Sequence, residues 1–287
     1  MSESNRIPGD RQHLERLIDV WVREGSGLGQ SRLRRLLGFT AIAAMLDGLP
    51  GEDGRARLVI KGGGGLQLRL GARARTTSDL DTAFRGDIIE ARDLLRSALI
   101  RGWSGFEGVL SDEVEITRAG ITPPPWRARI KLAYKSKPFS TVAFEMSAAE
   151  GASLDFPEYH RVAISLAPVQ LPDPGKIAFL PARYQIAQKL HACTEPPTGD
   201  HPNTRVRDLY DILLIAELVE LEEYPALSAA CREIFELRGR HTWPPVLSEQ
   251  PSWRETWRRL AEDRQVGLTF DQAFADVVDL IGRIETA

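Results

Sequence analysis

The chain of 287 residues carries 37 Lys and Arg against 40 Asp and Glu, a net charge of −3, and 43% of its residues are hydrophobic. These values are ordinary for a folded globular protein and exclude disorder, collagen and coiled coil as overall classes. No apolar run approaches the roughly 20 residues of a membrane helix. Met1–Asp10 lacks the apolar core of a signal peptide, and two cysteines are too few for a disulfide framework. We therefore expect a cytoplasmic protein with no membrane partner, and one that does not bind DNA in a histone-like way.

In the first half of the chain, the predicted helices alternate with predicted strands. Asp10 is placed to cap a helix with apolar residues at helical spacing, and a second helix is predicted from Ser31. The following elements are predicted next: a strand at Arg57–Ile60, a glycine turn at 61–65, a short helix at Leu66–Leu70, a strand at Ser78–Phe84, a helix at Ile88–Ile100, and strands at Arg127–Lys135 and Phe139–Met146. The last two strands are predicted to pair through the turn at Lys135–Pro138.

The second half of the chain has a helical pattern after a proline-rich connection. Helices are predicted at Ala182–Cys193, Arg205–Val219, Ala226–Leu237, Trp253–Arg264 and Asp271–Ile284. We therefore predict an α/β (α+β) fold with two lobes. Residues 1–175 form the first, with a helical lead-in at 10–48 and an α/β core at 56–150, and residues 176–287 form the helical second lobe.

The sharpest local motif is an Asp-x-Asp pair on a predicted strand. Alternate residues of a strand share a face, so Asp79 and Asp81 project together while Leu80 is buried behind them. Two neighbouring carboxylates repel each other unless a cation joins them, and oxygen ligands suit Mg²⁺. Asp-x-Asp alone is also typical of a solvated strand or turn. Here it follows a strand and a glycine turn, and that order favours a metal site.

The glycine turn Lys61-Gly62-Gly63-Gly64-Gly65 allows the backbone to approach a ligand closely. Backbone N–H groups at such a turn, or at the helix after it, can hold phosphates. The turn does not fit a Walker loop, because its lysine precedes the glycines, and it lacks the third glycine of the dinucleotide fingerprint.

Five blocks of the sequence resemble the polymerase β-like nucleotidyltransferase superfamily and, within it, the AbiEii/MenT family of toxins from toxin–antitoxin systems. The blocks are Lys61–Arg69, Arg75–Thr82, Gln185–Ala192, Arg207–Asp211 and Phe235–Pro245. The resemblance implies a bilobed fold, with a mixed sheet in a polymerase β-like nucleotidyltransferase lobe and a helical C-terminal lobe. It also implies a Mg²⁺- or Mn²⁺-dependent enzyme that transfers a nucleotide from an NTP to the 3′ end of tRNA and so blocks translation.

The same resemblance assigns roles to individual residues. It makes Asp79, Asp81, Lys189 and Asp211 catalytic, and makes Lys61, Gly62, Gly63, Gly64 and Arg238 nucleotide-binding. Relatives often carry serine where this chain has Gly64, so one side-chain donor to the phosphates is missing. A pyrimidine nucleotide is one candidate for the NTP. A cognate antitoxin is an expected partner, and Thr77 or Ser78 is a candidate for regulatory phosphorylation, which would add about two negative charges beside the carboxylates.

Several of these residues also have plain structural interpretations. Glu145 is a candidate third metal ligand or an exposed residue of an edge strand. Lys189 can neutralise a triphosphate or lie on the surface, and Asp211 can orient Lys189 or a metal-bound water, or form a surface ion pair with Arg207. Without the resemblance, Arg238 is an exposed arginine at a helix end. His191, packed or exposed, lies near Cys193, but no second pair at zinc spacing follows.

Charge is segregated along the chain. Residues 116–144 hold six basic residues and no acidic one, whereas residues 215–236 hold six glutamates and one arginine. Arg127, Arg129, Lys131 and Lys135 are therefore predicted to bind an RNA backbone. The alternative is a solvated edge strand protected by its charges. Trp126 is predicted either to stack on a base or to pack into its own loop.

Two other functions remain open from the sequence. One is an adenylyltransferase that acts on a protein or a small molecule, which the basic strand disfavours for a small acceptor. The other is a nucleotide-binding regulator without catalysis, which has no need of paired carboxylates.

Overall fold

A computed structural model describes residues 7–47, 49, 55–117, 123–197, 202–264 and 267–287. The chain divides into two compact units. The first unit comprises Met1–Ala149 and Leu154–Leu180, and the second comprises Glu150–Ser153 and Pro181–Ala287. The boundary predicted after residue 175 stays a prediction. Across the described ranges, no helix is long and apolar enough to cross a membrane.

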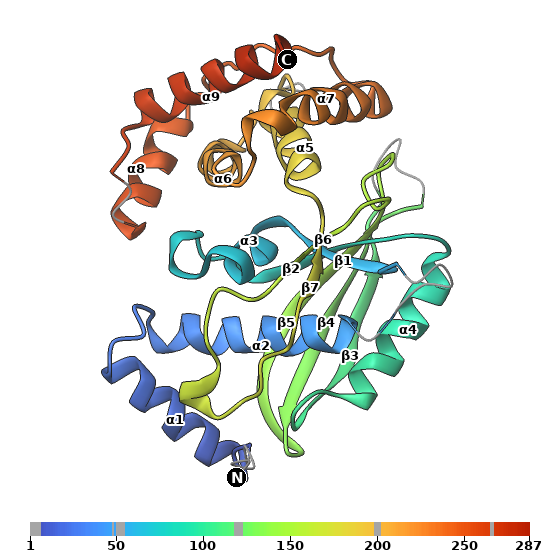
Figure 1. The fold of residues 1–287 in the computed structure, drawn as a ribbon, viewed down its shortest axis with the longest axis vertical. Helices are drawn as coiled ribbons and strands as arrows, with labels where there is room; N and C mark the ends of the chain where they lie inside the picture. Colours follow the sequence, from blue (N-terminus) through green and yellow to red (C-terminus); the bar gives the residue numbers. More distant parts are fainter. Residues whose placement is uncertain (1–6, 48, 50–54, 118–122, 198–201, 265–266) are drawn as a thin grey trace. The chain divides into compact units, whose positions relative to one another are not determined.

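The first unit is a mixed sheet with helices (Figure 1). Its elements are α1 (Arg11–Arg23), α2 (Gln30–Asp47), β1 (Leu58–Lys61), α3 (Gly62–Leu70), η1 (Gly71–Arg73), β2 (Asp79–Phe84), α4 (Ile88–Arg101), β3 (Phe106–Glu115), β4 (Trp126–Tyr134), β5 (Lys137–Ala148), β6 (Glu158–His160), η2 (Ala167–Val169) and β7 (Ile177–Phe179). The described strands form a seven-stranded sheet in the order β3-β4-β5-β2-β1-β7-β6. The mixed α/β class predicted from the sequence is confirmed.

Strand pairing places the centre of the sheet at β5, β2 and β1. β2 is antiparallel to β1 and parallel to β5, while β4 is antiparallel to both β3 and β5. Both edge-strand alternatives are therefore wrong, because β4 and β5 each have a neighbour on both sides. β3, β6 and β7 were not among the predicted elements. β3 contains a glycine and several acidic residues, which are uncommon in strands, and it is stabilised by its pairing with β4.

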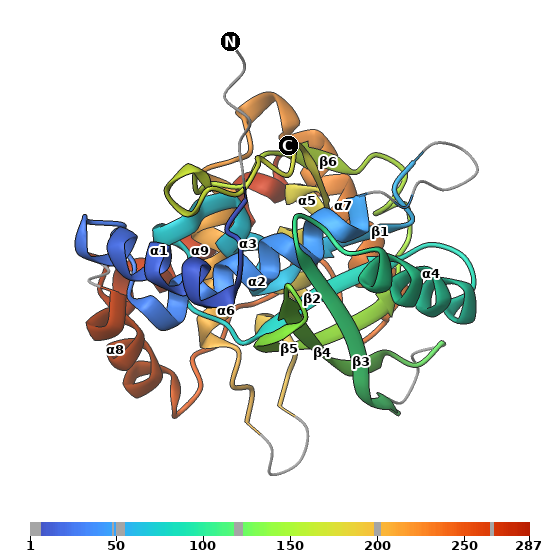
Figure 2. The ribbon, with the colours of Figure 1, turned by 90° about the horizontal axis from the view of Figure 1, so that it is seen from below.

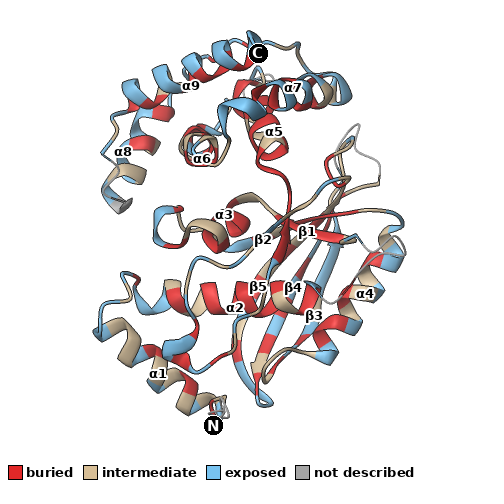
Figure 3. Ribbon diagram, viewed as in Figure 1, coloured by how far each residue is buried: buried red, intermediate tan, exposed pale blue. Residues whose placement is uncertain are grey.

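Helices α2 and α4 cover one face of this sheet. α2 packs against β5 and α4, and α4 packs against β3. Figure 2 shows α2 running across the strands, and Figure 3 shows its buried residues. On β4 the residues facing these helices are at most 1% exposed: Trp126, Ala128, Ile130, Leu132 and Tyr134. Trp126 packs edge-on against Phe144, with 6.4 Å between ring centroids. The prediction that Trp126 stacks on a base is wrong, because its ring is in the core.

The second unit is helical. Its elements are α5 (Ala182–Thr194), α6 (Val206–Ala216), η3 (Leu221–Glu223), α7 (Tyr224–Arg238), α8 (Trp253–Arg264) and α9 (Phe270–Glu285). α5 packs against α6 and α7, and α9 packs against the same two helices. These helices lie within a few residues of their predicted bounds, because their apolar residues recur at helical spacing.

Candidate active site

The paired aspartates lie on β2 as predicted. Asp79 is exposed and Asp81 is half-buried, while Leu80 between them is fully buried. The hydroxyl of Ser78 donates a hydrogen bond to Oδ1 of Asp79 at 2.8 Å. The backbone N–H of Asp79 donates to Oγ1 of Thr77 at 3.4 Å. Both carboxylates therefore project from one face of the strand, and the two hydroxyl residues before them contact Asp79 directly.

Strand register extends the aspartate pair into a row of charges across four strands. Asp81 of β2 is in register with Lys61 of β1 and with Glu145 of β5, and Glu145 is in register with Arg127 of β4. Residues in register share a face of the sheet. We call this the polar face; it also carries Arg129 and Lys131 and lies opposite the helices α2 and α4.

Glu145 and Arg127 form an ion pair on the polar face. Nη2 of Arg127 donates to Oε2 of Glu145 at 2.8 Å, and the two side chains are 52% and 20% exposed, respectively. The pKa of Arg127 is raised, first by its hydrogen bond to Glu145 and also by the charges of Glu145, Asp79 and Asp81. Arg127 therefore lies in the negative field of the three carboxylates.

The glycines form the first turn of helix α3, not a turn that precedes it. α3 begins at Gly62, directly after β1, and Lys61 at its N-cap makes no side-chain capping bond. Gly62 has a φ of +64°, and a Cβ there would lie 2.2 Å from Oδ2 of Asp81. Only glycine allows this close approach, which brings the N-terminus of a helix, with its partial positive charge, against the carboxylate.

Positions 63 and 64 differ in the space around them. A Cβ on Gly64 would lie 2.8 Å from the carbonyl oxygen of Asp79 and 3.0 Å from the side chain of Leu80. A Cβ on Gly63 would meet Arg75 and Thr77 at 3.3 Å, a contact that small adjustments relieve. The chain therefore has no room for a serine at position 64. Lys61 itself points back along the polar face, where its Nζ donates to Oγ of Ser147 at 2.6 Å.

The carboxylates are of the type that binds a divalent metal, but their side chains do not point to one common position. Asp79 and Asp81 offer the oxygen ligands that Mg²⁺ and Mn²⁺ prefer. Among the described residues, however, no group of three or more His, Cys, Asp or Glu side chains is arranged to hold a metal ion. Glu145 is turned to Arg127, so its assignment as a third ligand remains a prediction that requires a change of partner.

The predicted RNA-binding cations lie on β4 and at its end. Arg127, Arg129 and Lys131 alternate along the strand and are exposed. Arg129 has Asp112 at 3.6 Å, and both side chains are about two-thirds exposed. Lys135 lies in the two-residue turn between β4 and β5, with a φ of +48°. The strand therefore presents cations on the polar face, although Arg127 and Arg129 already have carboxylate neighbours.

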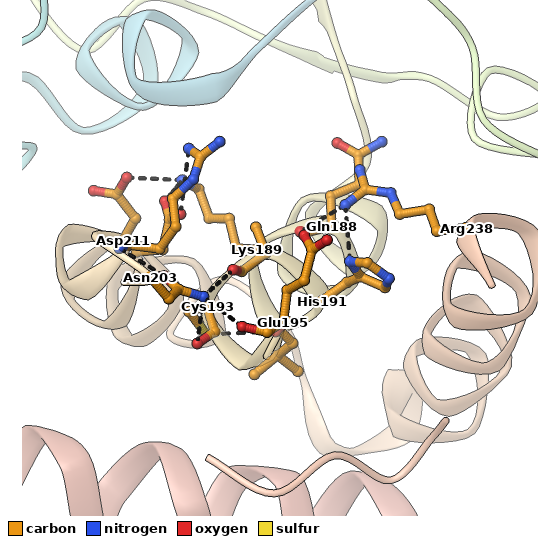
Figure 4. A network of polar contacts seen from close by, with 12 residues as sticks. Gln188, Lys189, His191, Cys193, Glu195, Asn203, Asp211 and Arg238 are labelled. Carbon is orange, nitrogen blue, oxygen red and sulfur yellow. Dashed lines mark hydrogen bonds and ion pairs between the residues drawn. The ribbon is translucent and has the colours of Figure 1, made fainter. Parts of the chain in front are cut away.

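Lys189 of the second unit lies between two aspartates, of which Figure 4 labels Asp211. Its Nζ is 2.6 Å from Oδ1 of Asp208 and 2.8 Å from Oδ2 of Asp211. The Asp211 side chain is fully buried, and that of Lys189 is 12% exposed. Lys189 is thus not a surface lysine, and Asp211 forms no surface ion pair with Arg207. Because Asp208 and Asp211 are three residues apart on α6, they lie on one helix face, a spacing that could have identified Asp208 from the sequence.

Arg238 ends α7 in a network of partners (Figure 4). Its Nε and Nη2 donate to the two carboxylate oxygens of Glu150, at 2.7 and 2.8 Å. Its Nη1 donates to the carbonyl oxygen of Gln188 at 3.3 Å and to Nδ1 of His191 at 3.4 Å. The side chain is 26% exposed, so it is not the solvent-facing arginine of the plain interpretation. No sequence motif identified Glu150, which is distant in the chain from its partners.

His191 is packed inside the second unit. It is 1% exposed, and its ring contacts Phe235 edge-on, with 4.9 Å between centroids. Burial lowers the pKa of His191 to about 4, and the charge of Arg238 adds to the shift. The ring is therefore neutral near pH 7, and its Nδ1 accepts the hydrogen bond from Arg238.

The chain matches a known family of proteins. Residues 44–279 match the family model "Nucleotidyl transferase AbiEii toxin, Type IV TA system". The match covers most of the chain, which therefore belongs to this family of nucleotidyltransferase toxins.

A solved structure with a TM-score above 0.5 supports the fold. The chain is similar to MenT4, a nucleotidyltransferase toxin from Mycobacterium tuberculosis, with a TM-score of 0.52 and 16% identity over 93% of this chain and 92% of that one. A nucleotidyltransferase candidate from H. pylori has a TM-score of 0.48 and 17% identity over 90% of this chain and 96% of its own. None of the curated proteins matches the chain in sequence.

Proposed function

We propose that this toxin transfers a nucleotide from an NTP to the 3′ end of tRNA and thereby blocks translation. The observation that carries the proposal is the placement of Asp79 and Asp81 on the sheet face that also bears the cations of β4, beside the N-terminus of α3. In the proposed reaction the RNA 3′-hydroxyl attacks the α-phosphate of the NTP, and pyrophosphate leaves.

The proposed nucleotide-binding residues are those of the glycine turn and three cations. Backbone N–H groups of Gly62, Gly63 and Gly64 at the start of α3 are suited to a phosphate, because a helix N-terminus favours negative charge. Lys61, Lys189 and Arg238 supply further positive charge for the triphosphate. Of these, Lys189 and Arg238 already contact carboxylates, so their role is to complete a preformed network around the phosphates.

Asp79 and Asp81 are the proposed metal ligands, with Glu145 as a third. When bound there, Mg²⁺ or Mn²⁺ neutralises phosphate charge and activates the attacking hydroxyl. The ion pair between Glu145 and Arg127 holds that carboxylate on the polar face. Asp211 is assigned the role of fixing Lys189, as the 2.8 Å contact suggests.

The acceptor RNA is assigned to the polar face of β4. Arg127, Arg129 and Lys131 recur at every second residue, and Lys135 continues the series at the turn. Such a row of cations suits a phosphate backbone, whose binding is then weakened by salt. The placement favours RNA over a small acceptor, which needs no row of charges.

A cognate antitoxin is the proposed regulator, acting by phosphorylation of Thr77 or Ser78 in the cytoplasm. Ser78 is exposed and its hydroxyl contacts Asp79. A phosphate on either residue would repel both the carboxylates and the NTP. Mass spectrometry of the protein after co-expression with a neighbouring antitoxin tests this; unmodified Thr77 and Ser78 in an inhibited protein would contradict it.

One experiment separates the three functions. The protein is incubated with Mg²⁺, total tRNA and each α-labelled NTP in turn, beside an Asp79→Ala variant and a Glu107→Gln control on β3. Label on tRNA that is lost only in Asp79→Ala supports the proposal. Label on the protein itself supports an adenylyltransferase acting on protein, and NTP binding without any transfer supports a regulator.

A further inference from the structure

Arg238 has almost no hydrogen-bonding capacity left for a ligand. An arginine side chain carries five N–H groups. Two of them go to Glu150, and two go to the carbonyl oxygen of Gln188 and to Nδ1 of His191. Within the part of the chain that the structure describes, this leaves one N–H on Nη2 for another partner. The guanidinium is therefore fixed in its plane, and its remaining donor points in one direction.

Glu150, the main partner of Arg238, is itself held in place. Nε2 of Gln188 donates to its Oε2 at 2.6 Å. Two residues further on, the backbone N–H of Ala152 donates to Oε1 of Glu233 at 2.8 Å, and Oε2 of Glu233 accepts from the hydroxyl of Tyr184 at 2.7 Å. The carboxylate of Glu150 is thus anchored both through its side chain and through the backbone that follows it.

Gly151 shows how closely this segment is packed. It has a φ of +54°, and a Cβ there would lie 2.1 Å from Oε1 of Glu233. Any other residue would be strained and would also displace Glu233. The segment Glu150–Ser153 belongs to the second unit, although the residues on either side of it in sequence belong to the first. This short segment therefore fits the surface formed by α5 and α7 in one conformation.

We propose that Glu150 is a positioning residue, which holds the guanidinium of Arg238 in the orientation that binds a nucleotide phosphate. The inference rests on the proposed function, in which Arg238 contacts the triphosphate. A bidentate carboxylate fixes both the plane and the rotation of a guanidinium, so less conformational entropy is lost when a phosphate binds. A mobile carboxylate that merely occupied the phosphate position would not need anchoring by Gln188 and Glu233.

The test is nucleotide binding, measured by calorimetry with ATP, GTP, CTP and UTP in turn and Mg²⁺ present. Glu150→Gln keeps the size of the side chain and removes its charge, and we expect the Kd for the bound NTP to rise about tenfold. Gln188→Met removes only one contact to Glu150, and we expect a rise of about threefold. Glu236→Gln, an exposed glutamate of α7, is the matched control and should leave the Kd unchanged.

A double-mutant cycle shows whether Glu150 acts through Arg238. If it does, Glu150→Gln adds nothing to the loss caused by Arg238→Ala, so the double variant binds NTP as weakly as Arg238→Ala alone. In transfer assays KM for the NTP should rise with kcat little changed. If Glu150 has a purely structural role, the losses of NTP affinity in the two single variants add in the double variant, and this result would overturn the proposal. Tighter NTP binding by Glu150→Gln would also overturn it, because it would mean that Glu150 competes with the phosphate.

The outcome for Arg238→Ala separates this inference from the proposed function. Normal NTP binding by Arg238→Ala removes Arg238 from the nucleotide site and overturns the positioning role, whereas the proposed function fails only if the parent protein transfers no label to tRNA. Weakened binding by Arg238→Ala, together with normal binding by folded Glu150→Gln and Gln188→Met, overturns the positioning role alone. Thermal unfolding of each variant identifies any that fail to fold, and the two independent changes around Glu150 keep the test decisive if one of them does.

Discussion

The carboxylates of the two units of this toxin differ in exposure and in their partners. Asp79 in the first unit is exposed, and among the described residues its hydrogen bonds are to Ser78 and Thr77, its neighbours in sequence. Asp211 in the second unit is fully buried against Lys189. An exposed carboxylate keeps its hydration and is accessible to a ligand, whereas a buried one loses its hydration and must be paired with a positive charge. The first arrangement is suited to binding, and the second is suited to positioning.

The two arrangements also depend on different parts of the structure. On β2 and β5, strand register fixes which carboxylates share the polar face, and it needs no side-chain contact between them. In the second unit the helix spacing of Asp208 and Asp211 brings two carboxylates to one lysine, and the side chains themselves hold the geometry. Substitutions in the two regions should therefore affect different properties.

The largest expected effect is on transfer activity. Asp79→Asn removes a charge that the proposed metal requires, and we expect transfer to fall about 10³-fold. Stability should change little, because the side chain is exposed and no buried partner depends on it. Labelled transfer and urea unfolding measure the two quantities. A variant that loses stability as well as activity would show that the β2 carboxylates also support the fold.

Asp211→Asn, unlike Asp79→Asn, should reduce stability strongly. It removes the charge of one of the two carboxylates that contact Nζ of Lys189 in a buried site, and breaking such a pair costs about 3 kcal/mol of unfolding free energy. Asp276→Asn, an exposed aspartate on α9, is the control for the charge change alone. If Asp211→Asn is as stable as this control but inactive, then Asp211 serves the ligand directly and the comparison between the two units fails.

A smaller effect is expected at the glycine turn. Gly64→Ser places a Cβ 2.8 Å from the carbonyl oxygen of Asp79, so β2 must shift, and we expect a loss of about 2 kcal/mol. Gly63→Ser has contacts at 3.3 Å, and we expect it to stay within about 0.5 kcal/mol of the parent because serine also favours helix over glycine. Chemical unfolding of both variants decides this. Equal losses would mean that the two positions are equally crowded.

The sequence was sufficient for features that depend on local pattern. The alternation of polar and apolar residues on β2 and β4 correctly predicted the faces on which Asp79, Asp81 and the β4 cations lie. The helical spacing of apolar residues in the second half of the chain predicted its helices. Asp10 caps α1 as predicted, with its Oδ1 accepting from the backbone N–H of His13 at 2.7 Å.

Features that depend on contacts between distant residues could not be predicted in this way. The pairing of Glu145 with Arg127 follows from strand register, and that of Glu150 with Arg238 joins residues far apart in the chain. The burial of Trp126 depends on packing with α4, where Arg92 lies over its ring, and nothing in its own segment indicates this contact. The start of α3 at Gly62 depends on tertiary contacts, because four glycines have a poor intrinsic preference for helix.

The buried ring of His191 predicts an acid sensitivity that is specific to the second unit. Its pKa in the folded protein is about 4, whereas an unfolded histidine has a pKa of about 6.5. Between these values the unfolded state binds more protons, so stability is lost as the pH falls from 6.5 towards 4. We expect His191→Asn to reduce the loss between pH 7 and pH 5 by on the order of 1 kcal/mol.

Urea unfolding at both pH values measures this change. His160→Asn in β6, which replaces a histidine with a 42% exposed side chain, is the control for the loss of a histidine outside the second unit. An unchanged pH dependence in His191→Asn would show that another group causes the acid sensitivity.

The smallest expected effect concerns the polar face of β4, where single charges contribute little. Lys131→Gln removes one exposed cation that no carboxylate contacts within the described residues. If Lys131 contacts a phosphate, the slope of log K for tRNA against log[salt] should fall by about 1, and affinity at low salt should fall a few-fold. Arg129→Gln should have a smaller effect, because Asp112 already lies 3.6 Å from that guanidinium. On β4, a phosphate binds most readily to a cation without a carboxylate neighbour. If both variants have the same salt slope as the parent, the RNA-binding surface must therefore lie elsewhere.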